Sequence, residues 1–105
     1  MESALLTLNV PPALEEALVD WLLEQPHVQG FTSMQVYGHG SGASAMSVGE
    51  QVLGRQKRLQ FMVHGEMQAL QALLQDLRQT YPGAGLHYFL SPIISGGPIS
   101  GETLG

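Results

Sequence analysis

The residues of this sequence that could hold a metal ion are its histidines. Neutral imidazole nitrogens suit Zn, Cu and Ni ions. No two histidines have the i, i+4 spacing that places two ligands on one face of a helix, so the spacing alone indicates no ready-made metal site. His39 is the strongest candidate ligand, because it lies in a long stretch rich in glycine and serine. The four histidines are His27, His39, His64 and His87.

A second group that could bind a ligand is the cation cluster Arg55, Lys57 and Arg58. These residues make up three of the four lysines and arginines in the chain. The cluster could contact an anion or an acidic partner, or it could be the solvated base of a loop. The sequence leaves both interpretations open.

The sequence contains no recognisable catalytic arrangement. Ser41, Ser44 and Ser47 lie in the glycine-rich stretch, but none sits in a nucleophile elbow and none has a His or Asp partner at a suggestive spacing. The chain has no cysteine, which excludes a catalytic thiol and a disulfide. We therefore predict a binding and signalling protein, with a small hydrolase or isomerase in a subunit cleft as the rival interpretation.

The composition is that of a single globular domain spanning residues 1–105. Hydrophobic residues make up 44% of the chain and charged residues 12%, about half the usual charged fraction of ~25%. A neutral surface of this kind is typical of an oligomer subunit or of a small monomer rich in Gln and Ser. The net charge of −5 disfavours nucleic acid as a partner. The first residues are not a basic leader and no apolar run approaches ~18 residues, so we expect a cytoplasmic protein without direct membrane insertion.

The elements that must position these residues follow the order β-α-β-β-α-β. Alternating apolar residues predict strands, and apolar stripes at helical spacing from Leu14 to Leu22 and from Met67 to Leu77 predict two helices. This order indicates an α+β, ferredoxin-like sandwich, in which both helices cover one face of a four-stranded antiparallel sheet. The predicted strands are residues 4–10, 31–37, 58–64 and 86–90.

The sheet face away from the helices is expected to mix polar and apolar side chains. Such a face can lie in water or against another subunit, and the sequence does not decide between them. The residues predicted for this face are Thr7, Asn9, Ser33, Gln35, Gln60, Met62 and Phe89.

The connection between the second and third strands is the predicted working part. It covers about residues 38–57, roughly twenty residues where a hairpin takes about 2–5. Connections this long in a small domain are usually functional or disordered. Because this one is rich in glycine and serine and lacks proline, we expect it to be mobile.

Two short motifs frame the second strand. Gly30-Phe31-Thr32 opens the strand and Gly38-His39-Gly40 closes it, and the tail contains Ile99-Ser100-Gly101-Glu102. In order and spacing these motifs resemble those of the PII-like signalling proteins, the nitrogen regulatory protein PII superfamily. The resemblance implies a homotrimer with its sheets facing inward, a T-loop at about 38–57, a C-terminal tail at 91–105 and a ligand cleft between subunits.

The chain departs from the nucleotide-binding members of that superfamily at their phosphate contacts. Ser41-Gly42 stands where an Arg/Lys-Gln pair is typical, residues 82–85 carry no cation, and residues 95–99 lack the terminal arginines. ATP is therefore expected to bind poorly, although a nucleotide-binding PII homologue remains an alternative.

The divergent pattern resembles an uncharacterised PII-like branch associated with heavy-metal efflux systems. This resemblance implies a membrane efflux component as a possible protein partner. The cofactor is unidentified, and a transition-metal ion held by His39 and His87 across the subunit interface is one candidate. The predicted cleft and loop-base residues are Thr32, Gly38, His39, Gly40, Arg55 and Arg58.

Overall fold

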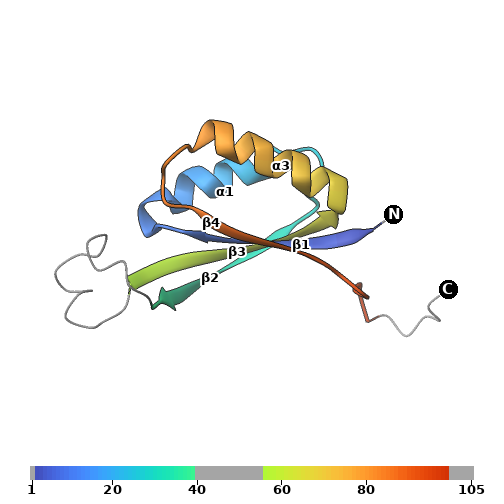
Figure 1. Cartoon of the computed structure of the whole chain (residues 1–105). Coiled ribbons are helices and arrows are strands. Elements are labelled where there is room, and N and C mark those ends of the chain that lie inside the picture. Colours follow the sequence, from blue (N-terminus) through green and yellow to red (C-terminus); the bar gives the residue numbers. More distant parts are fainter. Residues whose placement is uncertain (1, 40–55, 100–105) are drawn as a thin grey trace.

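The structure, a computed structural model, describes residues 2–39 and 56–99. Four strands of this part of the chain form one antiparallel sheet in the order β2-β3-β1-β4, and both helices lie on the same face of it (Figure 1). The predicted ferredoxin-like α+β fold is therefore confirmed. The elements are β1 (Ser3–Val10), the 3₁₀ turn η1 (Pro12–Leu14), α1 (Glu15–Leu23), β2 (Phe31–Gly38), β3 (Gln56–Glu66), α3 (Met67–Thr80) and β4 (His87–Pro92).

The core lies between the sheet and the two helices, where the predicted apolar patterns place it. In β1 the alternate residues are buried against the helices, as a half-buried strand requires. The apolar stripe of α3 is buried, and α1 adds Leu18 and Leu22. The buried residues are Ala4, Leu6, Leu8, Val10, Leu18, Leu22, Leu59, Phe61, Val63, Leu70, Leu73, Leu74 and Leu77.

The third strand is longer than its alternating pattern suggested. β3 continues through Gly65 to Glu66 and runs directly into α3, without a connecting loop. The register explains this, because Gly65 still pairs with Ala4 and Glu66 with Ser3 at the start of β1. The junction is fixed by the Met67 backbone N–H, which donates to the Glu2 carbonyl at 2.9 Å.

The prediction that Ser33 and Gln35 lie on the open face of the sheet is wrong. Opposite residues of an antiparallel pair share a face, and Ser33 pairs with the fully buried Phe61. The open face of β2 instead carries Thr32, Met34 and Val36. Ser33 and Gln35 stay exposed on the helix side because β2 is an edge strand.

The predicted T-loop falls largely outside the described residues. Its first and last residues belong to strands, because β2 ends at Gly38 and β3 begins at Gln56. Residues 93–99 follow β4 as an irregular segment, and the last part of the predicted tail is also outside the described residues. Neither described helix is both long and apolar enough to cross a membrane.

Candidate functional site

One end of the sheet brings together the two strand ends that flank residues 40–55 and the turn before β4. We call it the loop-base end. The antiparallel order places the end of β2, the start of β3, the end of β1 and the start of β4 there. Gly38 pairs with Gln56 at this end, and Asn9 of β1 pairs with His87 of β4.

Arg58 ties these elements together. Its Nη2 donates to the Gly85 carbonyl at 2.6 Å and to the Asn9 carbonyl at 3.3 Å. The side chain therefore reaches from β3 across the end of β1 to the turn between α3 and β4. On its other side, a Cβ placed on Gly38 would lie 3.4 Å from Arg58 Cγ, so the strand end packs closely on the arginine stem.

The turn that receives Arg58 depends on glycine. Gly83 and Gly85 have φ of +66° and +82°, in the left-handed region that favours glycine. A Cβ on Gly85 would also lie 3.4 Å from Pro11 Cγ. The turn thus packs on the end of β1 in a conformation that presents the Gly85 carbonyl to Arg58.

The open sheet face beside Arg58 is partly polar and partly apolar. Gln60 Nε2 donates to Asn9 Oδ1 at 3.2 Å, which joins β3 to β1 on this face. Met34 and Phe89 also lie on it by register and are 45% and 68% exposed. A face that exposes large apolar side chains is typical of an interaction surface.

The predicted site residues divide into three groups. Gly38, His39 and Arg58 lie at the loop-base end. Thr32 lies six residues before Gly38 on β2, about 20 Å away along the strand, on the open face at the opposite end. Gly40 and Arg55 lie outside the described residues.

The two histidines proposed as metal ligands do not meet within one subunit. His39 follows β2 and His87 begins β4, at opposite edges of the sheet and both exposed. Strands β3 and β1 lie between these edges, and three strand spacings amount to about 14 Å. Among residues 2–39 and 56–99 no three His, Asp or Glu side chains gather into a candidate metal site.

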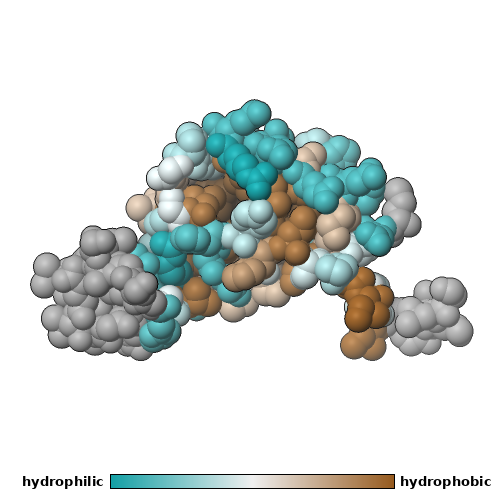
Figure 2. Space-filling view, viewed as in Figure 1, coloured by the Kyte–Doolittle hydropathy of each residue, from teal (hydrophilic) through white to brown (hydrophobic). Residues whose placement is uncertain are grey.

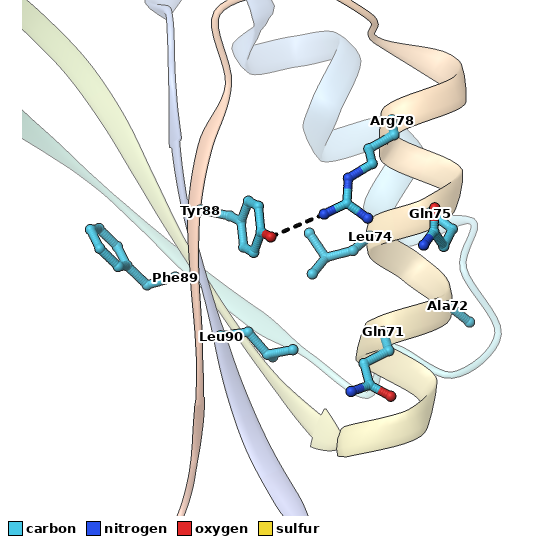
Figure 3. Close-up of a pocket in the computed structure, with 8 residues that line it drawn as sticks. All are labelled: Gln71, Ala72, Leu74, Gln75, Arg78, Tyr88, Phe89 and Leu90. Carbon is cyan, nitrogen blue, oxygen red and sulfur yellow. Dashed lines mark hydrogen bonds between the residues drawn. The ribbon is translucent and has the colours of Figure 1, made fainter.

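A groove that the sequence did not reveal lies between α3 and the edge strand β4 (Figure 3). Its volume is about 770 Å³, and Leu74, Tyr88 and Leu90 point into it from the two elements. Arg78 Nη2 donates to the Tyr88 hydroxyl at 3.0 Å, with the guanidinium carbon 5.5 Å from the ring centroid. A smaller pocket of about 380 Å³ lies beneath the turn and shares Leu74, Arg78 and Tyr88 with the groove.

One sequence signal could have located this groove. Alternation in the last strand sends Tyr88 and Leu90 to the face opposite His87 and Phe89. Tyr88 and Leu90 must therefore lie on the helix side, where Arg78 is the last cation of the neighbouring helix.

The family model described as "Protein of unknown function (DUF3240)" matches residues 1–100. The chain belongs to this family. No curated protein matches the chain in sequence.

Solved structures share the fold of this chain at low sequence identity. A DUF3240 family protein from Shewanella baltica OS155 matches with a TM-score of 0.75 at 21% identity, over 93% of this chain and 97% of the other. CPII, a nitrogen regulatory PII-like protein from Thiomonas intermedia K12 bound to ADP, AMP and bicarbonate, matches with a TM-score of 0.68 at 20% identity, over 94% and 98%. GlnK from B. subtilis in complex with ATP matches with a TM-score of 0.64 at 17% identity, over 88% and 82%. The fold of this DUF3240 chain is therefore the PII-like fold.

Proposed function

We propose that this protein is a non-enzymatic, PII-like regulatory protein of the cytoplasm. It binds a small ligand between subunits at the loop-base end and signals to a partner protein through residues 38–57. The observation that carries the proposal is the PII-like fold, which places the two ends of that segment beside Arg58 and the turn before β4.

The proposed assembly is a homotrimer whose open sheet faces lie inward. Its support is the exposure of Met34 and Phe89 on that face, together with the low charged fraction of the chain. A second subunit would remove these apolar side chains from water. Light scattering should give about three times the 11.3 kDa chain mass, and a monomer mass at micromolar concentration would refute the assembly.

Neighbouring subunits would complete the ligand site. Within one chain His39 and His87 lie at opposite sheet edges, so only two different subunits could bring them to one ion. We propose a transition-metal ion as the ligand and a heavy-metal efflux component as the protein partner. Arg55 and the backbone N–H groups of Gly38 and Gly40 would then bind an anion that accompanies the metal ion. Arg58 would hold the turn, because its guanidinium already donates to two backbone carbonyls.

A nucleotide is the second candidate ligand. Two proteins with this fold have structures that contain adenine nucleotides, CPII with ADP and AMP and GlnK with ATP. They lend no support to weak ATP binding, an expectation that rests only on the missing cations at residues 41–42, 82–85 and 95–99. A small enzyme in the subunit cleft is the third candidate, for which the described residues offer no specific observation.

A thermal-shift screen separates these candidates. The wild-type protein is tested with Zn²⁺, Cu²⁺, Ni²⁺, ATP, ADP and AMP, beside His39→Ala and His87→Ala. The matched control is His27→Ala, which removes another exposed histidine, from the connection between α1 and β2. The metal proposal predicts that at least one of the ions raises the melting temperature of the wild-type protein. Both test variants should lose this shift, and the His27→Ala control should keep it. No shift with any ion, or an unchanged response of His39→Ala, would refute the metal role.

A further inference from the structure

Residues 93–99, which we call the exit segment, expose two large apolar side chains. Ile94 and Ile99 are fully exposed, at 103% and 104%. The Ile93 backbone N–H donates to the Ser3 carbonyl at 2.9 Å, and beyond it the chain leaves the body of the domain (Figure 1). In the space-filling view this segment is a separate apolar cluster beside the domain (Figure 2). Isoleucine side chains this fully exposed to water are typical of a surface that contacts another molecule.

The groove between α3 and β4 is concave, whereas the exit segment projects from the domain. Leu74 and Leu90 give it an apolar floor, and Phe89 points away from it onto the open face (Figure 3). Its strand wall, β4, is an edge of the sheet as far as the chain is described, so one row of its backbone groups faces outward. Such an edge can accept an extended segment as an additional strand, while a neighbouring hollow takes alternate side chains.

Charge indicates which molecule fits the groove. Residues 91–99 carry no charged side chain. Among the described residues that line the groove, Arg78 is the one with a charge, and it contacts Tyr88. The chain as a whole has a net charge of −5, so most contacts between two copies bring like charges together. A neutral segment against a nearly neutral groove avoids that repulsion. Both surfaces belong to every copy, which is the condition for a head-to-tail contact between copies.

We propose that the exit segment of one copy docks in the groove between α3 and β4 of a second copy. The inference deepens the proposed self-assembly, on which it rests, by assigning one of its contacts. Ile94 supplies the apolar anchor in the groove, and the backbone around Ser95 to Gly97 lies along the outer edge of β4. Ile99, five positions further on, falls on the opposite face of an extended segment. To occupy its own groove, the segment would have to reverse direction directly after Pro92.

The absence of cysteine from the chain permits a clean cross-linking test. Two single-cysteine variants are mixed and treated with a short bis-maleimide: Ile94→Cys in the exit segment and Gln71→Cys at the groove wall. The matched control replaces Gln71→Cys by Gln79→Cys, which places an exposed thiol on the same helix outside the groove. We expect the first pair to give a product of twice the chain mass at least tenfold faster than the control pair. Equal rates for the two pairs would overturn the proposal.

A double variant and a charge substitution complete the test. Ile94→Cys and Gln71→Cys in one chain would cross-link within the monomer if the segment folds back on its own groove, and that result at high dilution would also overturn the proposal. Ile94→Asp should weaken self-association at least tenfold, whereas Leu23→Asp, which alters another exposed apolar residue on α1, should leave it unchanged. Light scattering separates the two hypotheses. A monomeric wild type refutes the assembly itself, and an oligomer without the specific cross-link refutes only this contact.

Discussion

Replacing Arg58 by methionine tests whether this side chain holds the loop-base end together. The change keeps the apolar stem that packs on Gly38 and removes the guanidinium that donates to the Gly85 and Asn9 carbonyls. Hydrogen bonds from a charged group contribute about 1.5–3 kcal/mol. The bond to Gly85 is exposed and the bond to Asn9 is long, so we expect the free energy of unfolding to fall by about 1–2 kcal/mol.

Urea unfolding followed by Trp21 fluorescence measures this loss. Trp21 is the single tryptophan and packs edge-on against Tyr81 at the start of the turn, with ring centroids 6.4 Å apart. With an m value of ~1–2 kcal/mol/M, the midpoint should fall by about 0.5–2 M at equal protein concentration. Arg78→Met is the matched control, because it removes an exposed hydrogen bond and ring contact between side chains of α3 and β4, away from the loop-base end. An unchanged midpoint for Arg58→Met, or an equal fall for the control, would refute the role assigned to Arg58.

Three further predictions concern the turn, the core and the ligand. Gly85→Ala should lower the melting temperature by about 5–10 °C in a thermal melt, because its φ of +82° and the nearby Pro11 oppose a Cβ; Gly30→Ala, with open space around it, should leave it unchanged. Leu70→Ala should cost about 2–5 kcal/mol in chemical unfolding because Leu70 is buried in the core, whereas Leu23→Ala, at a 70% exposed position, should cost less than about 0.5 kcal/mol. ATP should bind with a Kd no tighter than roughly millimolar in calorimetry, because each missing charge-assisted hydrogen bond forfeits about 1.5–3 kcal/mol; low-micromolar affinity would favour the nucleotide-binding alternative.

Local pattern was sufficient where a strand or helix has one clearly apolar face. The alternation of β1 and the leucine stripe of α3 predicted their buried residues, because burial of those faces dominates the packing of each element. The order of these elements along the chain then predicted the ferredoxin-like fold. Two glycine motifs and the length of the connection between the second and third strands were enough to suggest a resemblance to the PII-like proteins.

The β2 strand shows where local pattern failed. Each of its faces carries a mixture of polar and apolar residues, so alternation divided the strand into two faces but did not say which one meets the helices. Pairing with β3 decided it, since Ser33 lies opposite the buried Phe61 and Thr32 opposite Met62. The edge position of β2 explains why such a face can remain polar.

Only the tertiary structure decided the contacts that define the candidate surfaces. Arg58 meets Asn9 and Gly85 across 49 and 27 residues of chain, a proximity that the strand order creates and that no local spacing encodes. The groove between α3 and β4 exists because Tyr88 and Leu90 face a helix that ends several residues earlier in the sequence. The sequence by itself determined which faces are apolar and hence the fold. Which polar side chains meet depended on how the strands pair, because hydrogen bonds form between groups that the folded chain brings within about 3 Å.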